Sequence, residues 1–204
     1  MLSRAISRRL ANSGFLSRPS LTASAVCFTH ENLRSNAEMS LAWASRTTSV
    51  GKETFYAVLP FFHAFGMSLS LLCAVGLAAT QVVLPKFGAD LVLAAWKRRP
   101  ATFFPGVPVM FDRLVTRARA TGADLSSCKI AVCGAAPNPL AVAQAWEEAT
   151  GGTIIEGYCM TESSPIMVRP SLSARRMSMS SSARKPCTAY PICWPSAAAR
   201  TRRR

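Results

Sequence analysis

The chain has 204 residues and half of them are hydrophobic, so it can bury a core and its composition is not that of a disordered protein. The formal net charge is +14, but residues 30–166 contain eleven Lys and Arg residues and all ten acids. The positive charge therefore belongs to residues 1–29 and 167–204, which contain no acid. This distribution argues against a specific nucleic-acid surface, where basic residues line a folded face.

The middle of the chain alternates between helical and strand patterns. The first elements predicted are a helix over 31–44 capped by Thr29, a strand over 54–59 ended by Pro60, a buried helix over 64–77 and a buried strand over 80–84. A helix over 90–98 follows, with Leu91, Val92, Ala95 and Trp96 turned inward, and then a strand over 101–104. The last elements are a helix over 108–120, a strand over 129–133, a helix over 138–149 and a strand over 153–156. This alternation predicts an α/β fold of parallel β-α units that binds ligands at the carboxyl ends of its strands.

Three features of the sequence could indicate other kinds of protein or a targeting signal. The uncharged stretch over 66–84 contains Ser, Thr, Gln and Gly, so we interpret it as a buried helix and strand and not as a transmembrane segment. The seven cysteines include no C-x-x-C pair, which argues against zinc and a disulfide framework, and Cys73 and Cys133 are expected to be small buried hydrophobic residues in a reducing compartment. Residues 1–20 are rich in Arg and Ser, a composition typical of a mitochondrial transit peptide.

The loops after the predicted strands carry three motifs in order. They are Leu59-Pro-Phe-Phe-His63-Ala-Phe-Gly66, Cys133-Gly-Ala-Ala-Pro137 and Glu156-Gly-Tyr158-Cys-Met-Thr161-Glu162-Ser-Ser-Pro165. With Thr29-His-Glu-Asn-Leu33, this ordered set closely resembles the adenylate-forming acyl-CoA synthetases, and long-chain fatty-acid–CoA ligases in particular. The resemblance implies part of the large N-terminal domain of the adenylate-forming fold. It also implies an enzyme that activates a fatty acid with ATP and Mg²⁺ and passes the acyl group to coenzyme A.

The resemblance also implies roles for residues of these motifs. Thr161 would contact phosphate and Glu162 would bind Mg²⁺, which makes them the expected catalytic residues. The nucleotide and acyl-adenylate would meet Gly134, Ala135, Ala136, Pro137, Gly157 and Tyr158. His63 and Phe65 would position the substrate. Phe61, Phe65, Phe104, Met110 and Phe111 could line an apolar acyl tunnel, but core packing is the role expected of any one of them.

The sequence also departs from the family pattern. The phosphate loop expected directly before Thr29 is replaced by residues 21–28, which contain neither glycine nor lysine. The later ribose-binding aspartate, the hinge and the small C-terminal domain with its lysine are not found. Cys159 stands where the family has glycine, which adds a β-carbon in the nucleotide loop.

These departures lead to an expected division of the chain into three parts. Residues 26–166 are the central part of an AMP-binding domain, while residues 1–25 and 167–204 are unmatched, basic and expected to be disordered. We therefore expect a truncated or frame-disrupted ligase that is inactive alone, cytoplasmic and peripheral to membranes; mitochondrial import is the second interpretation. The alternative function is a non-enzymatic basic-tailed protein that binds polyanions or an anionic membrane surface.

Overall fold

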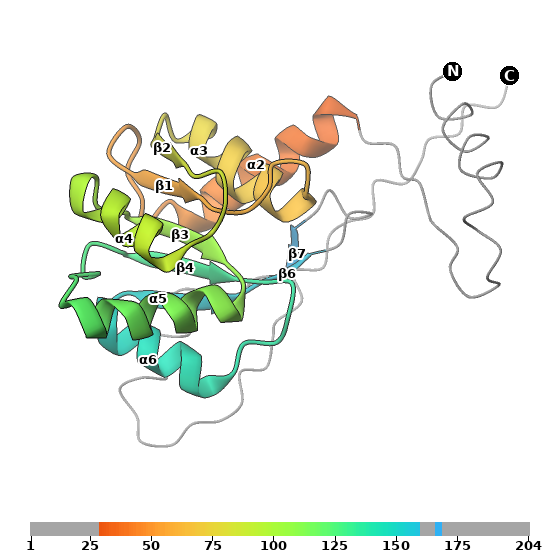
Figure 1. Ribbon diagram of the computed structural model, residues 1–204. Helices are drawn as coiled ribbons and strands as arrows, with labels where there is room; N and C mark the ends of the chain where they lie inside the picture. Colours follow the sequence, from red (N-terminus) through yellow and green to blue (C-terminus); the bar gives the residue numbers. More distant parts are fainter. Residues whose placement is uncertain (1–28, 160–165, 169–204) are drawn as a thin grey trace, which may run out of the picture.

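The computed structural model describes residues 29–159 and 166–168, which form a parallel sheet with helices on both faces (Figure 1). The sheet has the order β2-β1-β3-β4-β5 and all four strand pairs are parallel. Its strands are β1 (Thr54–Ala57), β2 (Thr80–Val83), β3 (Phe103–Gly106), β4 (Ile130–Cys133) and β5 (Thr153–Glu156). The helices are α2 (His30–Ala44), η1 (Gly66–Leu72), α3 (Cys73–Gly76), α4 (Ala89–Arg98), α5 (Pro108–Thr121) and α6 (Leu140–Thr150). The predicted α/β fold of parallel β-α units is confirmed.

The two faces of the sheet are built from alternate residues of the same strands. Phe55 and Phe103 stack with their ring centroids 4.2 Å apart and pack against η1 and α3. Their neighbours Tyr56 and Phe104 point to the other face, where they join residues of α4, α5 and α6. Side chains alternate between the faces of a strand, so a sheet covered on both faces needs continuously apolar strands. This requirement explains why these strands show no polar alternation in the sequence.

Several element boundaries and environments differ from the prediction. The strand β2 lies at the edge of the sheet and its residues are half-buried or exposed, so the prediction of a buried strand is wrong. Leu91 is 40% exposed, whereas Val92 and Trp96 are buried as expected. The third strand begins at Phe103 and not at residue 101, because the backbone pairs with β4 over the range Phe103–Gly106. Two short antiparallel strands, β6 (Tyr158–Cys159) and β7 (Ile166–Val168), were not predicted.

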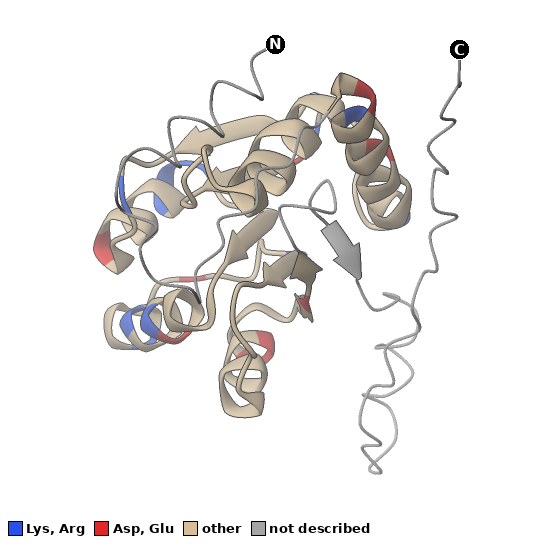
Figure 2. Cartoon of the chain, turned by 90° about the vertical axis from the view of Figure 1, so that its right-hand side faces the viewer, with Lys and Arg blue, Asp and Glu red and all other residues tan. Residues whose placement is uncertain are grey.

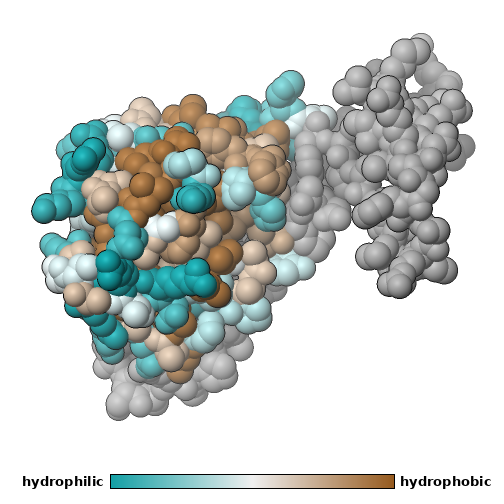
Figure 3. All heavy atoms as spheres, in the orientation of Figure 1, coloured by the Kyte–Doolittle hydropathy of each residue, from teal (hydrophilic) through white to brown (hydrophobic). Residues whose placement is uncertain are grey.

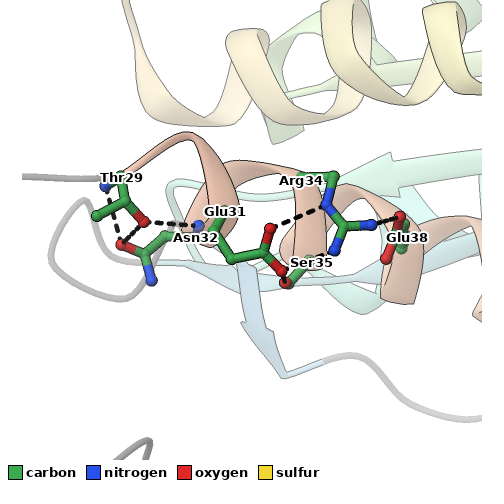
Figure 4. A network of polar contacts seen from close by, with 6 residues as sticks. All are labelled: Thr29, Glu31, Asn32, Arg34, Ser35 and Glu38. Atoms are coloured by element: carbon green, nitrogen blue, oxygen red, sulfur yellow. Dashed lines mark hydrogen bonds and ion pairs between the residues drawn. The ribbon is translucent and has the colours of Figure 1, made fainter. Parts of the chain in front are cut away.

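The start of α2 is fixed by its own side chains (Figure 4). The Thr29 hydroxyl accepts a hydrogen bond from the Asn32 backbone amide at 3.1 Å, and Asn32 Oδ1 accepts one from the Thr29 amide at 2.9 Å. Farther along the helix, Arg34 forms ion pairs with Glu31 and Glu38. The predicted cap at Thr29 is confirmed, and the two reciprocal bonds satisfy amides that a helix start leaves free.

Membrane and cysteine predictions can be compared with the same residues. Within residues 29–159 and 166–168, no helix is long and apolar enough to cross a bilayer. The thiols of Cys73, Cys128, Cys133 and Cys159 are free, and the first three are buried. Across this described part, no group of three His, Cys, Asp or Glu residues could hold a metal ion. Cys73 and Cys133 are thus buried small residues, as the sequence predicted.

Candidate functional site

The sheet has a topological switch point between the adjacent strands β1 and β3. From β1 the chain passes through η1 and α3 to β2 on one side, whereas β3 leads through α5 to β4 on the other face. The loops after the adjacent strands β1 and β3 therefore diverge to opposite faces. In open α/β sheets such a switch point leaves a crevice at the carboxyl ends of the strands, and ligands bind there.

The loop after β1 contains the first motif and turns tightly into a helical stretch. The His63 amide donates to the Pro60 carbonyl at 3.1 Å, and the Phe65 amide donates to His63 Nδ1 at 3.2 Å. A β-carbon on Gly66 would lie 2.3 Å from the Pro60 carbonyl oxygen, so only glycine permits this close approach. His63 is exposed, whereas Phe65 is 3% exposed and belongs to the core.

The second motif forms the turn between β4 and α6. Gly134 continues the sheet, since its amide donates to the Gly106 carbonyl at the end of β3 at 3.1 Å. Ala135 has a φ of +65°, a left-handed conformation that is unfavourable for a residue with a β-carbon. Backbone strain of this kind persists where the surrounding structure imposes it and is concentrated at functional sites. Ala135, Ala136 and Pro137 are all exposed at this turn.

Gly134 is the point at which the three motifs meet. A β-carbon placed on it would lie 3.1 Å from Cε1 and Cζ of Phe65, which belongs to the first motif, and 3.4 Å from the carbonyl oxygen of Gly157, which belongs to the third. The Gly157 amide in turn donates to the Cys133 carbonyl at 2.8 Å. Motifs that lie far apart in the sequence thus contact one another at one glycine.

The end of β5 carries the third motif outward into β6. Tyr158 is 58% exposed, which leaves an aromatic ring accessible next to the β4–α6 turn. The Asn138 amide donates to Oε1 of Glu156 at 3.3 Å, and this bond joins the turn to the last residue of β5. Among the described residues, the buried Oδ1 of Asn138 has no hydrogen-bond partner. Asn138 was assigned no role from the sequence because it lies one residue beyond the second motif. Glu156 was named only as the first residue of the third motif.

The thiols at this edge are unreactive, and its loops carry no charged side chain. Burial, together with the Glu156 carboxylate, raises the pKa of Cys133 to about 12, and burial also raises the pKa of Cys159. Both thiols are therefore protonated at neutral pH and are poor nucleophiles. The loops over 58–66, 134–139 and 157–159 contain no Lys, Arg, Asp or Glu. Figure 2 is turned so that this edge faces the viewer, and the charged residues lie mostly on the surrounding helices.

The predicted site residues divide into three groups. Gly134, Phe65 and Gly157 are in contact, and His63, Ala135, Ala136, Pro137 and Tyr158 lie on the loops of the same edge. Thr161 and Glu162, the predicted phosphate and metal residues, lie outside the described residues.

The five apolar residues that could line an acyl tunnel do not all lie on the same face of the sheet. Phe65 packs on the face covered by η1 and α3, whereas Phe104 and Phe111 are 0% exposed on the opposite face, with Met110 packed against their cluster. The sheet separates the two groups because Phe104 follows Phe103 in β3 and consecutive residues of a strand face opposite ways. Phe104 and Phe111 contact each other and Trp146 as core residues.

The comparisons with known proteins extend this picture. The family model described as AMP-binding enzyme matches residues 24–195, which continues past Ile166, where the sequence motifs end. A long-chain-fatty-acid–CoA ligase of Bacillus subtilis is 34% identical over 141 residues, which cover 69% of this chain and 25% of that protein. A feruloyl-CoA synthase of an Amycolatopsis species is 31% identical over 137 residues, which cover 67% of this chain and 27% of that protein.

Solved structures share the fold. The apo structure of MatB from Rhodopseudomonas palustris superposes with a TM-score of 0.63 and 25% identity, over 72% of this chain and 28% of that one. The chain thus spans about a quarter of the length of the curated relatives that it matches. Since the family model matches most of the sequence, including all residues of the carboxyl-edge site, the chain belongs to the family of AMP-binding enzymes.

Proposed function

We propose that this chain provides the acyl-adenylate-binding edge of a long-chain fatty-acid–CoA ligase, which joins a fatty acid to AMP and transfers the acyl group to coenzyme A. The observation that carries the proposal is the meeting of three motif loops at Gly134, next to the switch point between β1 and β3. A ligand at this edge would contact backbone amides and carbonyls at strand ends, an exposed tyrosine ring and an exposed histidine.

Each part of the edge offers a different contact. The exposed ring of Tyr158 provides a surface on which a planar base can stack, and such stacking contributes about 1–3 kcal/mol per base. The β4–α6 turn exposes two small residues, Ala135 and Ala136, so a ligand can approach the backbone there. His63 Nδ1 accepts the Phe65 amide, so a neutral His63 presents Nε2–H as the donor available to a carboxylate.

The substrate class follows from the relatives and the apolar surroundings. The relatives named above act on long-chain fatty acids or on ferulate, so the family includes apolar and aromatic acids. Phe61 and Met67 are half-buried on the first motif loop and its helix, beside the exposed Phe62. An alkyl chain laid on such a surface gains about 0.8 kcal/mol per buried methylene, a gain that acetate cannot make.

Magnesium would be held by Glu162 together with the phosphates of ATP. Mg²⁺ commonly takes only one or two carboxylates when it binds substrate phosphates, so one glutamate in this segment is compatible with the ion. When bound, the ion supplies positive charge that neutralises the phosphates. The residues described above bind the base, the carboxylate and the alkyl chain.

Binding of a stable acyl-adenylate mimic tests the proposal without requiring turnover. The full chain is titrated with palmitoyl-sulfamoyl-adenosine and, in parallel, with acetyl-sulfamoyl-adenosine, by calorimetry. We expect the palmitoyl compound to bind more tightly, and Tyr158→Ala to weaken it by about 1–3 kcal/mol, while Tyr158→Phe retains the ring and most of the affinity.

The control for Tyr158→Ala is Val50→Ala, which truncates an exposed apolar residue in the loop before β1, away from the site. Equal binding by the wild type and Tyr158→Ala, or no binding of either mimic by a folded chain, would show that this edge does not hold the adenylate.

A further inference from the structure

The amino edge of the sheet, opposite the candidate site, gathers exposed basic residues from several parts of the sequence. They are Lys52 before β1, Lys97 and Arg98 in the last turn of α4, Arg99 after it and Lys129 before β4; we call these five residues the amino-edge patch. Hydrogen bonds show that these segments are neighbours: Arg99 Nη2 donates to Thr80 Oγ1 at 2.7 Å, and the Lys129 amide donates to the Thr102 carbonyl at 3.0 Å. The patch is therefore one surface and not a scatter of distant charges.

The patch keeps an excess of positive charge within the described part of the chain. Two acids lie beside its five cations. The Glu53 carboxylate is buried and pairs with Lys129 Nζ at 3.0 Å. Asp124 is exposed on the loop before β4, which lies against the end of α4 because Trp96 Nε1 donates to Ser127 Oγ at 3.0 Å. Lys52, Lys97 and Arg98 form no ion pair with any other described residue, in contrast to Arg117 and Arg119, which pair with Asp90 and Glu148. In Figure 3, hydrophilic surface lines the left-hand side of the molecule, the side on which α4 lies in Figure 1.

An exposed apolar residue lies beside these cations. Val50 is 70% exposed at the tip of the loop that leads into β1, two residues before Lys52. The loop is tied down on both sides, because the Gly51 amide donates to the Leu77 carbonyl at 2.7 Å and the Ser49 amide donates to Glu53 Oε1 at 2.9 Å. Val50 is thus presented by a fixed turn, in a position to enter an apolar layer while Lys52 remains at a polar boundary.

An anionic lipid surface fits this arrangement better than a nucleic acid does. Single-stranded nucleic acids are bound by exposed aromatic rings between basic residues, but the exposed aromatic residues of the described chain, Phe62 and Tyr158, lie at the opposite edge. The rings nearest the patch, Tyr56 and Trp96, are buried. Basic residues beside a small exposed apolar side chain are typical of peripheral membrane contact. The basic residues bind the anionic headgroups and the apolar side chain enters the boundary of the acyl layer.

We propose that the amino-edge patch and Val50 bind the surface of a membrane that contains anionic lipids. The cations would lie at the headgroups and Val50 would enter the boundary of the acyl layer. Because the motif loops lie at the carboxyl ends of the same strands, the candidate site would face away from the bilayer and stay open to water-borne ligands. This proposal does not depend on the ligand of that site.

Vesicle sedimentation of the full chain tests the proposal. Vesicles of phosphatidylcholine with about one third phosphatidylserine are compared with pure phosphatidylcholine vesicles at about 0.1 M salt. The double variant Lys97→Gln/Arg98→Gln should bind the anionic vesicles roughly tenfold or more weakly than wild type. Val50→Ser should bind them several-fold more weakly and keep the same salt dependence, because it removes apolar contact and no charge.

The matched control is Lys86→Gln/Arg113→Gln, which removes two exposed cations from the β2–α4 loop and the first half of α5. It retains the basic ends of the chain and the same net charge as the patch variant, so it should bind within about twofold of wild type. Equal losses in the two double variants would assign vesicle binding to overall charge or to the ends, and would overturn the proposal. Tighter binding of the wild type to a single-stranded oligonucleotide than to anionic vesicles, lost in the patch variant, would also overturn it. Circular dichroism melts check that each variant is folded, and Lys52→Gln tests the patch from a separate loop if the helix variant is not.

Discussion

The ring of Phe65 lies against the backbone of Gly134 so closely that a β-carbon there would meet two ring carbons at 3.1 Å. Phe65 belongs to the loop and helix after β1, and Gly134 to the turn after β4, so this contact joins the first and second motifs across the end of β3. Glycine is thus required here for packing between motifs, in addition to any contact with a ligand.

Gly134→Ala is expected to destabilise the fold by about 1–3 kcal/mol, because the added methyl group would press on the ring of Phe65, which is itself buried. Phe65→Leu alone should also destabilise the fold, since it leaves space in the core. In the double variant the smaller leucine makes room for the methyl group, so the combined loss should be less than the sum of the two single losses. Urea unfolding of the four proteins measures this coupling, and strictly additive losses would contradict the contact.

Glu53 should contribute to resistance against acid. Burial alone would raise the pKa of this carboxyl, but hydrogen bonds from Thr102, the Ser49 amide and Lys129 outweigh burial and hold the pKa below its ordinary value of about 4.5. A lowered pKa in the folded state stabilises the fold above the ordinary value, and this stabilisation is lost as the pH falls below 4.5 through the lowered pKa.

The test compares Glu53→Gln with Glu38→Gln, which removes an exposed carboxylate that pairs with Arg34 on α2. Melting temperatures are measured between about pH 7 and pH 3. Glu53→Gln should be less stable than wild type at neutral pH and should lose less stability on acidification. Glu38→Gln should keep the acid dependence of the wild type. If the Glu53 variant shows the wild-type slope, the ionised carboxylate is not a net stabiliser.

The helix after the first motif contains two buried serines in an unusual environment. Ser68 and Ser70 are 1% and 0% exposed in η1, and neither hydroxyl oxygen has a hydrogen-bond partner among the described residues. Ser40 in α2 provides the contrast, because its buried hydroxyl donates to the Asn36 carbonyl at 2.8 Å.

Ser68→Ala and Ser70→Ala are therefore expected to be neutral or stabilising, by up to about 1 kcal/mol, since they remove desolvated hydroxyls that gain no bond. Ser40→Ala should destabilise the fold by about 0.5–1.5 kcal/mol, because it removes a satisfied buried bond. Chemical denaturation of the three variants gives the comparison. A loss of more than about 1 kcal/mol in either η1 variant would show that its hydroxyl has a partner in the folded protein.

The sequence was sufficient to predict the layers but not the environment of each side chain. Apolar periodicity located the helices and strands because it reports which side of an element is buried. It could not show that β2 is an edge strand, since Thr80–Val83 is as β-branched as an interior strand and strand order depends on contacts between distant segments. For the same reason it could not separate Phe65 from Phe104, which look alike in sequence and lie on opposite faces of the sheet.

The candidate site was predictable to the extent that its residues lie in motifs. Gly134 and Gly157 were identified from the second and third motifs, and the structure adds that they meet at one point. Asn138 was missed because its importance depends on the bond from its amide to Glu156, in a different motif, and on its buried Oδ1. A contact of that kind has no signature in local sequence. The roles of Thr161 and Glu162 remain predictions from the resemblance.

His63 is held by a backbone bond that fixes which nitrogen carries its proton. The Phe65 amide donates to Nδ1 at 3.2 Å, so in the neutral ring Nδ1 has no hydrogen and Nε2 does. Nitrogen NMR of the histidine side chains at about pH 8 should show the Nε2–H tautomer for His63.

His63→Asn should retain most of the stability, because Oδ1 of asparagine can accept the same amide, whereas His63→Ala loses the acceptor and about 0.5–1.5 kcal/mol. The asparagine substitution also separates folding from binding, since it keeps the turn but offers no ring nitrogen. This variant should therefore fold like wild type and bind the palmitoyl-adenylate mimic more weakly. Equal stability of the alanine and asparagine variants would mean that the bond from Phe65 does not hold the ring, and a dominant Nδ1–H tautomer would contradict it directly.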